Sequence, residues 1–255
     1  MKIRIDTAAN SMVVEEDGVV ETLDLFSREG LEKMTGLWIK QQWNAANWRS
    51  LSWLGFPIWQ LPDDMIRLQE SLFRIQPDVI VETGVNQGGS AIFFASLCRL
   101  LGKGRVISID VHIPESVRKA VAESPYGEAI TLIQADSAAP DTVRKVRDLI
   151  RPGERTFVFL DSDHSRAHVL RELNAYAGLV SVGSYIVAAD GVMRILSDTP
   201  EGAAHWREDN PAAAAREFAA LNPNFIIQRP AALYGEEYVI RNLTYCPDGW
   251  LLRRS

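Results

Sequence analysis

The chain has few of the residues from which zinc sites and basic binding surfaces are built. Its 255 residues include two cysteines that lie far apart, Cys98 and Cys246, and four histidines without a repeated short spacing. This distribution excludes a zinc motif. Lysine and arginine (27) are outnumbered by acidic residues (33) and form no dense block, giving a net charge of −6 and a pI near 5.3. Nonspecific binding to nucleic acid or anionic membranes is therefore disfavoured, and we expect no nucleic-acid partner.

Long apolar runs, sequence repeats and low-complexity linkers are missing as well. No run of eighteen apolar residues occurs, and the opening Met1-Lys-Ile-Arg is followed by Asp6 and polar residues instead of an apolar signal-peptide core. We therefore expect no membrane span and a cytoplasmic location. With 47% hydrophobic and 24% charged residues, the chain can bury a large core. One α/β domain with an N-terminal appendage is expected.

The most informative stretch is residues 78–90, which read DVIVETGVNQGGS. The β-branched residues 79–81 predict a strand buried on both faces. A tight turn follows, in which three glycines supply positive φ and close backbone approach: Gly84, Gly88 and Gly89. Their spacing differs from the G-x-G-x-x-G dinucleotide fingerprint. Glu82, at the carboxyl edge of the strand, favours an ammonium or hydroxyl group over a phosphate. The alternative is a tight turn that binds no ligand.

Acidic residues also end the next four predicted strands. These strands are expected at 105–110, 130–136, 156–161 and 185–190, and their last residues are Asp110, Asp136, Asp161 and Asp190. Helical stretches between them predict a parallel sheet covered on both faces, with all five carboxylates along one edge. Such carboxylates repel one another unless water, hydroxyls or a cation lies among them. Taken singly, each aspartate is better explained as a helix N-cap or a loop charge, but this explanation is weak for the whole set.

The first seventy residues have a different pattern. Alternation in residues 2–5 and 11–14, with residues 15–18 between the second run and Val19-Val20, predicts a small hairpin, and a helix or two follows after about Leu23. Five of the seven tryptophans lie close together: Trp38, Trp43, Trp48, Trp53 and Trp59. They either pack in the core or a subunit interface, or form a lid whose indoles stack on a sugar. We therefore predict a segment 1–70, with a hairpin and a Trp-rich helical lid or oligomerisation segment, and a homo-oligomer.

Three apolar segments follow a helix predicted over 212–221. They are residues 225–228, 238–242 and 250–253, and the Cys246-Pro-Asp-Gly249 turn predicts a final hairpin. Residues 206–210, before that helix, are a second candidate for substrate contact.

This layout resembles the class I S-adenosylmethionine-dependent methyltransferases, whose first strand carries an E-x-G loop. Four motifs narrow the match, namely WLGFPIWQLPDD (53–64), VETG (81–84), GGS (88–90) and LDSDHS (160–165). Together they are similar to the cephalosporin hydroxylase and rhamnosyl O-methyltransferase family, over roughly residues 45–195. The resemblance implies a Rossmann-like α/β fold over residues 71–255. Its seven-stranded, mostly parallel sheet would have helices on both faces and a reversed seventh strand beside the sixth.

The resemblance also implies that residues 71–255 bind S-adenosylmethionine. Glu82, Gly84 and Ser90 would line its methionine end, Asp110 would hold the ribose, and Asp136 and Ser137 would face the adenine. The full set of expected cofactor-binding residues is Glu82, Thr83, Gly84, Gly88, Ser90, Asp110, Asp136, Ser137 and Asp161.

Sugar O-methyltransferases of this family bind Mg²⁺ through the fourth-strand Asp and an acidic pair ending the fifth, with a His three residues after the first ligand as base. Asp161 and His164 match this pattern, but the pair reads Ala189-Asp190, so one acid is absent. Mg²⁺ often takes one or two carboxylates and keeps several waters, so Asp161 and Asp190 are the expected ligands. Asp163 is a substitute ligand if the strand extends that far.

His164 and Asp161 are the expected catalytic residues, because a histidine beside a strand-end carboxylate can accept a hydroxyl proton near neutral pH. His168, one helical turn later, is expected to face solvent, and the alternative is a supporting contact to the site residues. The predicted function is Mg²⁺-assisted methyl transfer from S-adenosylmethionine to a hydroxyl of a sugar or glycosylated small molecule, such as a natural-product or cell-envelope glycoside. The alternative is a non-catalytic accessory protein that binds S-adenosylmethionine and supports a partner oxygenase, which Ala189 favours. A nicotinamide oxidoreductase is a third, weaker candidate.

Overall fold

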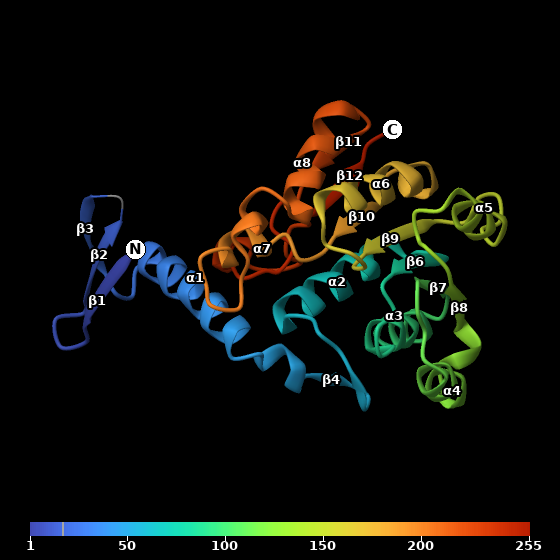
Figure 1. Cartoon of the computed structure of the whole chain (residues 1–255), viewed down its shortest axis with the longest axis horizontal. Coiled ribbons are helices and arrows are strands. Elements are labelled where there is room, and N and C mark those ends of the chain that lie inside the picture. Colours follow the sequence, from blue (N-terminus) through green and yellow to red (C-terminus); the bar gives the residue numbers. More distant parts are fainter. Residues whose placement is uncertain (17) are drawn as a thin grey trace.

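A seven-stranded sheet forms the centre of the computed structural model, which describes residues 1–16 and 18–255. The strand order is β11-β12-β10-β9-β6-β7-β8 (Figure 1). The strands are β6 (Val79–Thr83), β7 (Arg105–Asp110), β8 (Ile130–Gln134), β9 (Thr156–Leu160), β10 (Tyr185–Ala188), β11 (Phe225–Ile227) and β12 (Trp250–Arg253). Strands β6 to β10 are parallel, and β12 runs antiparallel to β10 and β11. The predicted mostly parallel sheet with a reversed last strand is confirmed.

Helices cover both faces of this sheet, as predicted. One face is covered by α5 (Pro140–Asp148), α6 (Arg166–Tyr176) and α8 (Pro211–Leu221), and the other by α2 (Pro62–Ile75) and α3 (Gly89–Leu100). The remaining α-helices of the described chain are α1 (Arg28–Asn44), α4 (Glu115–Glu123) and α7 (Met193–Leu196).

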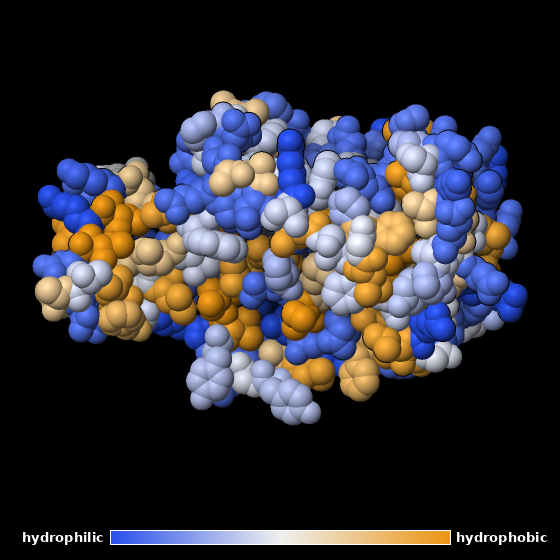
Figure 2. Space-filling view, turned by 90° about the horizontal axis from the view of Figure 1, so that it is seen from below, coloured by the Kyte–Doolittle hydropathy of each residue, from blue (hydrophilic) through white to orange (hydrophobic). Residues whose placement is uncertain are grey.

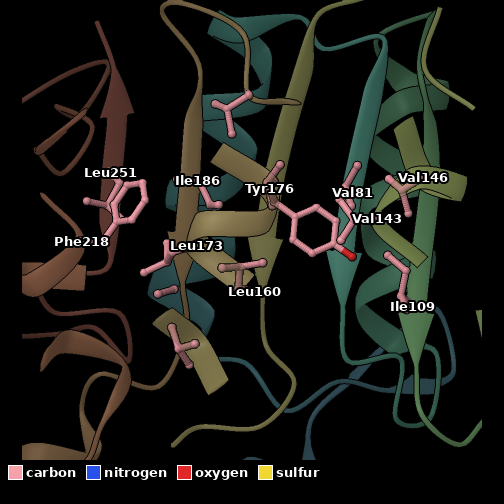
Figure 3. Close-up of a cluster of buried hydrophobic side chains, with 14 of the residues drawn as sticks. Val81, Ile109, Val143, Val146, Leu160, Leu173, Tyr176, Ile186, Phe218 and Leu251 are labelled. Carbon is pink, nitrogen blue, oxygen red and sulfur yellow. The ribbon is translucent and has the colours of Figure 1, made fainter. Parts of the chain in front are cut away.

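Alternation along the strands divides the core into two layers. Successive residues point to opposite faces, so Val81 belongs to the layer under α6 and Ile80 to the layer under α2 and α3. Figure 3 shows the first layer, in which Tyr176 and Leu173 lie over the sheet. Both side chains are fully buried.

The carboxyl ends of the parallel strands meet at one edge. Strand β7 ends at Asp110, while β8, β9 and β10 end one or two residues before Asp136, Asp161 and Asp190. The chain order reverses at β6, whose neighbours are β7 and β9. Ligands of open α/β sheets bind at such a switch point, beyond the carboxyl ends of the strands.

The N-terminal segment is a three-stranded antiparallel sheet where the sequence predicted a hairpin. Its strands are β1 (Lys2–Asp6), β2 (Ser11–Glu16) and β3 (Val19–Asp24), and the third strand pairs with β2 over six residue pairs. In Figure 1 this sheet projects from the rest of the molecule beside the N-terminal end of α1. Residue 70, the predicted boundary, lies inside α2, whose buried face includes Leu68 and Leu72 of the main core.

A short two-stranded ribbon connects α1 to α2. It consists of β4 (Ser52–Trp53) and β5 (Phe56–Pro57).

The predicted final hairpin is wrong, and the apolar segment 238–242 forms no strand. The segment begins in a 3₁₀ turn, Glu236–Tyr238, and continues without strand pairing. Its backbone is held by α1 instead, because the Arg28 guanidinium donates to the carbonyls of Glu237 and Val239. Strand β12 pairs with β10 and β11, so the turn before it connects no hairpin.

None of the helices formed by residues 1–16 and 18–255 combines the length and hydropathy needed to cross a bilayer. The cellular location stays a prediction.

Candidate active site

A cavity of about 640 Å³ opens at the carboxyl edge of the sheet. Its walls are the glycine turn after β6, the ends of β7 to β10, and residues 57–60 before α2. This volume lies within the range of small-molecule sites. Eight of the predicted site residues line it: Gly84, Ser90, Asp110, Asp136, Ser137, Asp161, His164 and Asp190.

The glycine turn places backbone where no side chain would fit. Gly84 has φ +90°, and a Cβ atom there would lie 1.9 Å from the carbonyl oxygen of Asp161. The close approach of β6 to β9 therefore requires glycine. Gly88 lies behind the cavity wall, where its φ of +85° begins α3.

Glu82 lies directly beneath the turn and is fully buried. The Ser108 hydroxyl donates to its Oε2 at 2.6 Å, whereas Oε1 is buried without a hydrogen-bond partner among the described residues. Burial raises the pKa of Glu82 to about 7, against the opposing effect of the Ser108 and Ser90 hydroxyls. A cation reaching this carboxylate would satisfy the orphan oxygen. Thr83, also predicted to bind cofactor, is buried, and its Oγ1 accepts the Asp161 backbone N–H at 3.3 Å.

Asp110 connects the glycine turn to β7. Its Oδ2 accepts the backbone N–H groups of Val85 (2.8 Å) and Asn86 (3.0 Å), and its Oδ1 accepts that of His112 (3.0 Å). These bonds fix the carboxylate at the cavity wall. A carboxylate in this position can accept hydroxyl donors from a ligand.

His168 does not face solvent, contrary to the expectation. Its Nε2 lies 3.3 Å from the Ser137 hydroxyl and from a carboxylate oxygen of Glu172, while the Arg171 guanidinium lies 2.8 Å from Nδ1. The buried Glu172 carboxylate raises the pKa of His168. Arg171 and Glu172 lie within one turn of His168 on α6, whereas Ser137 comes from the segment after β8, a contact that sequence spacing did not indicate.

Asp161, His164 and Asp190 converge at the floor of the cavity. One ligand atom from each lies within 4.8 Å of the others, and His164 Nε2 is 3.4 Å from Asp190 Oδ2. Burial, and then the Asp190 carboxylate, raise the pKa of Asp161 well above its usual value, and burial also raises that of Asp190. Asp190 has φ +57°, an uncommon backbone conformation that aspartate tolerates.

This donor set fits a divalent cation, since two partly buried acids that repel each other are stabilised by positive charge between them. Mg²⁺ accepts one or two carboxylates together with waters. Asp163 is not in the cluster. Its carboxylate accepts the backbone N–H of Ser165 at 2.8 Å at the start of α6. Ala189 is 1% exposed and packs in the core, so it leaves no acid at that position.

Gln60 is a site residue whose partner the sequence did not indicate. Its amide nitrogen donates to Asp161 Oδ2 at 2.7 Å, and its Oε1 is buried without a hydrogen-bond partner among the described residues. Residues 57–60 reach this point because they pack on the start of α3, where a Cβ atom on Gly89 would lie 2.0 Å from the Pro57 carbonyl oxygen. No spacing connects residue 60 to residue 161.

Some of the clustered tryptophans pack in the core, and others lie where a lid over the cavity would be. Trp53 packs in the core, with its indole N–H 3.0 Å from Ser96 Oγ and its ring 5.1 Å from that of Phe93. Trp59 lines the cavity, and its ring lies 4.8 Å from that of Trp48. The lid function stays a prediction.

Comparisons with known proteins agree with this architecture. The family model described as rhamnosyl O-methyltransferase/CmcI matches residues 45–254. A rhamnosyl O-methyltransferase of Mycobacterium bovis (strain BCG / Pasteur 1173P2) is 32% identical over 155 residues, which are 58% of this chain and 61% of that protein. The chain thus spans about three fifths of the length of this relative.

Two solved structures of CmcI share the fold. The apo structure of CmcI-N160 has a TM-score of 0.55 and 21% identity, covering 81% of this chain and 77% of that one. CmcI-D160 with Mg and SAM has a TM-score of 0.54 and 22% identity, covering 81% and 78%. The match of the family model over most of the chain establishes that this protein belongs to the rhamnosyl O-methyltransferase/CmcI family.

Proposed function

We propose that the chain transfers the methyl group of S-adenosylmethionine to a hydroxyl of a sugar or glycosylated small molecule, such as a natural-product or cell-envelope glycoside. The observation that carries this proposal is the convergence of Asp161, His164 and Asp190 at the floor of a 640 Å³ cavity. Family membership, the rhamnosyl O-methyltransferase relatives and the Mg and SAM of CmcI-D160 support it.

The cofactor would lie along the cavity from the glycine turn to Ser137. Glu82, whose Oε1 has no hydrogen-bond partner among the described residues, would attract its ammonium group from beneath the turn. Asp110 would accept the ribose hydroxyls, and Asp136 and Ser137 would border the adenine. Gly84, Gly88 and Thr83 act through the backbone that shapes this wall.

Asp161 and Asp190 would hold Mg²⁺, which when bound supplies a Lewis acid that lowers the pKa of a nearby acceptor hydroxyl. Gln60 orients Asp161 through its amide N–H. Groups that orient metal ligands in this way affect metal affinity and activity.

His164 would accept the proton of the acceptor hydroxyl. Asp190, whose Oδ2 is 3.4 Å from Nε2, orients the imidazole. Most of the acceleration would come from holding the acceptor oxygen in line with the methyl group. The same geometry also lets His164 act as a third metal ligand. The two roles predict different effects on metal affinity.

The alternative function is a non-catalytic accessory protein that binds S-adenosylmethionine and supports a partner oxygenase. Its specific support is the buried Ala189, which removes one acid from the predicted metal site. The test is incubation of purified protein with Mg²⁺, methyl-labelled S-adenosylmethionine and a panel of sugars and glycosides. Transfer to a panel member supports the enzyme. Cofactor binding without transfer to any member favours the accessory protein, and absence of cofactor binding contradicts both.

The base assignment is tested with His164→Ala, and His112→Ala, an exposed histidine, is the matched control. General-base assistance contributes about 10² to 10⁴-fold, so turnover should fall by that factor in His164→Ala alone. The deficit should shrink from pH 6 to 9, while affinities for S-adenosylhomocysteine and Mg²⁺ stay nearly constant. A large loss of Mg²⁺ affinity would assign His164 as a ligand, and an unchanged rate at every pH would reject both roles.

We also propose that the N-terminal segment mediates homo-oligomerisation. Figure 2 shows hydrophobic residues over this end of the face in view. In the N-terminal segment, three apolar side chains are 61–79% exposed: Val19, Val20 and Phe26. Within the described residues, β3 pairs on one edge only. Such apolar edges favour pairing with another chain. Val20→Lys should lower the mass measured by light scattering, whereas Leu221→Lys, an exposed apolar control on α8, should not.

A further inference from the structure

A second cavity of about 340 Å³ adjoins the candidate active site. It shares Ser162, Asp163 and His164 with the larger cavity, and its other lining residues are Ser165, Met193, His205, Trp206 and Asp209. These come from the start of α6, from α7 and from the segment 204–209, which includes the 3₁₀ helix η4 (Ala204–Arg207). The second cavity contains no residue of the glycine turn, so it is separate from the region that would hold the cofactor.

His164 lies where the two cavities meet. Displacement at a methyl group requires the acceptor oxygen on the side opposite the sulfur atom, with the reacting atoms in contact. With the cofactor in the larger cavity, the acceptor would approach the methyl group from the side of His164 that lies away from the glycine turn. The second cavity opens at that position.

The lining of this cavity combines a fixed aromatic ring with carboxylates. Trp206 is half-buried, and its ring packs edge-on against that of Trp43 at 6.4 Å and 87°, which holds the indole in place. Asp209 accepts the backbone N–H of Arg166 through Oδ1 at 2.6 Å, and its Oδ2 has no hydrogen-bond partner among the described residues. A rigid indole beside a free carboxylate oxygen suits a ring with one apolar face and hydroxyls at its edge.

The charge and size of the cavity limit the class of sugar that it can bind. Asp163 and Asp209 line it, so a negatively charged sugar would be repelled. At 340 Å³ it lies near the lower end of ligand-site volumes, which suits a single ring.

We propose that this second cavity is the acceptor subsite. One neutral or amino sugar ring lies against Trp206, one of its hydroxyls donates a hydrogen bond to Asp209, and its reactive hydroxyl points toward His164. This inference rests on the proposed function and adds the location and the charge of the sugar. Hexuronic acids are excluded as acceptors.

The test measures binding directly, so it does not depend on turnover. Methyl glycosides of neutral hexoses, 6-deoxyhexoses, an aminohexose and a hexuronic acid are titrated by saturation-transfer NMR in the presence of S-adenosylhomocysteine. Neutral or amino glycosides should bind and the hexuronide should not. Trp206→Ala should weaken binding by at least about tenfold, because truncated tryptophan anchors typically cost this much. Trp206→Phe should stay within about threefold, since it keeps a ring.

Two further variants separate the subsite from a general effect on folding. Asp209→Asn keeps an acceptor for the Arg166 N–H but removes the charge, so it should weaken amino-sugar binding several-fold and reduce rejection of the hexuronide. Tyr234→Ala, an exposed aromatic outside this cavity, is the control and should change nothing. Affinity for S-adenosylhomocysteine should be unchanged in all variants.

The outcomes distinguish this inference from the proposed function. If wild-type protein binds and methylates a glycoside but Trp206→Ala and Asp209→Asn bind it as tightly, the acceptor lies elsewhere and the methyltransferase assignment stands. If no glycoside binds, or the hexuronide binds best, the sugar subsite is rejected, whatever other hydroxyl compound is methylated.

Discussion

Replacing Glu82 with glutamine should stabilise the cofactor-free protein and weaken cofactor binding. The carboxyl group is fully buried, and burial raises its pKa from 4.5 to about 7. The folded protein therefore keeps a proton that the unfolded chain loses between these values, so the free energy of unfolding falls as pH rises from about 4.5 to 7. At 1.36 kcal/mol per pKa unit, the penalty above pH 7 is about 3 kcal/mol. Glutamine keeps the shape without ionising.

The expected gain at pH 8 is thus up to about 3 kcal/mol, or roughly 6–12 °C in melting temperature for a domain of this size. Below pH 4.5 the carboxyl is protonated in both states, and the gain should disappear. Melting curves of wild type and Glu82→Gln between pH 4.5 and 8 measure this difference. Glu123→Gln on the surface of α4 is the matched control and should change little.

Cofactor binding should respond in the opposite direction. If Glu82 pairs with the ammonium group, Glu82→Gln loses a charge-assisted contact of about 1.5–3 kcal/mol, a loss of roughly ten- to a hundredfold in affinity for S-adenosylhomocysteine. Wild-type affinity should rise from pH 6 to 8 as Glu82 ionises, and that of the variant should not. Equal melting temperatures at pH 8 together with equal calorimetric affinities would refute the reasoning.

Three further substitutions test the rest of the site. Asp110→Ala releases the Val85 N–H and the predicted ribose contact, so S-adenosylhomocysteine should bind roughly ten- to a hundredfold more weakly by calorimetry; unchanged affinity would contradict the assignment. Ala189→Glu adds an acid at a buried position, so its melting temperature should fall in chelator and rise with Mg²⁺ by more than that of wild type; equal Mg²⁺ shifts would count against the metal site. Gln60→Ala removes the amide that orients Asp161, so Mg²⁺ affinity should fall by about tenfold or more, and an unchanged titration would reject the orienting role.

Local sequence determined the parallel core and the edge where its acids emerge. The run 79–81 and the alternation of strands with helices suffice, because strands buried on both faces read as continuous apolar segments and short connections allow few topologies. The glycine at position 84 was also predictable, since the turn needs positive φ.

Tertiary structure alone decided the contacts between distant segments. The turn at 246–249 suggested a final hairpin, but the guanidinium of Arg28, which lies 211 positions before Val239, donates to the carbonyl of Val239. The contact of His168 with Glu172 is local, one turn along α6, but its contact with Ser137 forms only because α6 lies beside the end of β8.

The same limit applies to the active site. The motifs indicate its residue types. They do not indicate the contact of Gln60 with Asp161, the approach of His164 to Asp190 or the second cavity at Trp206. Hydrogen bonds and cavities depend on side-chain positions that neighbouring elements fix together. Periodicity reports only which face of its own element a residue occupies.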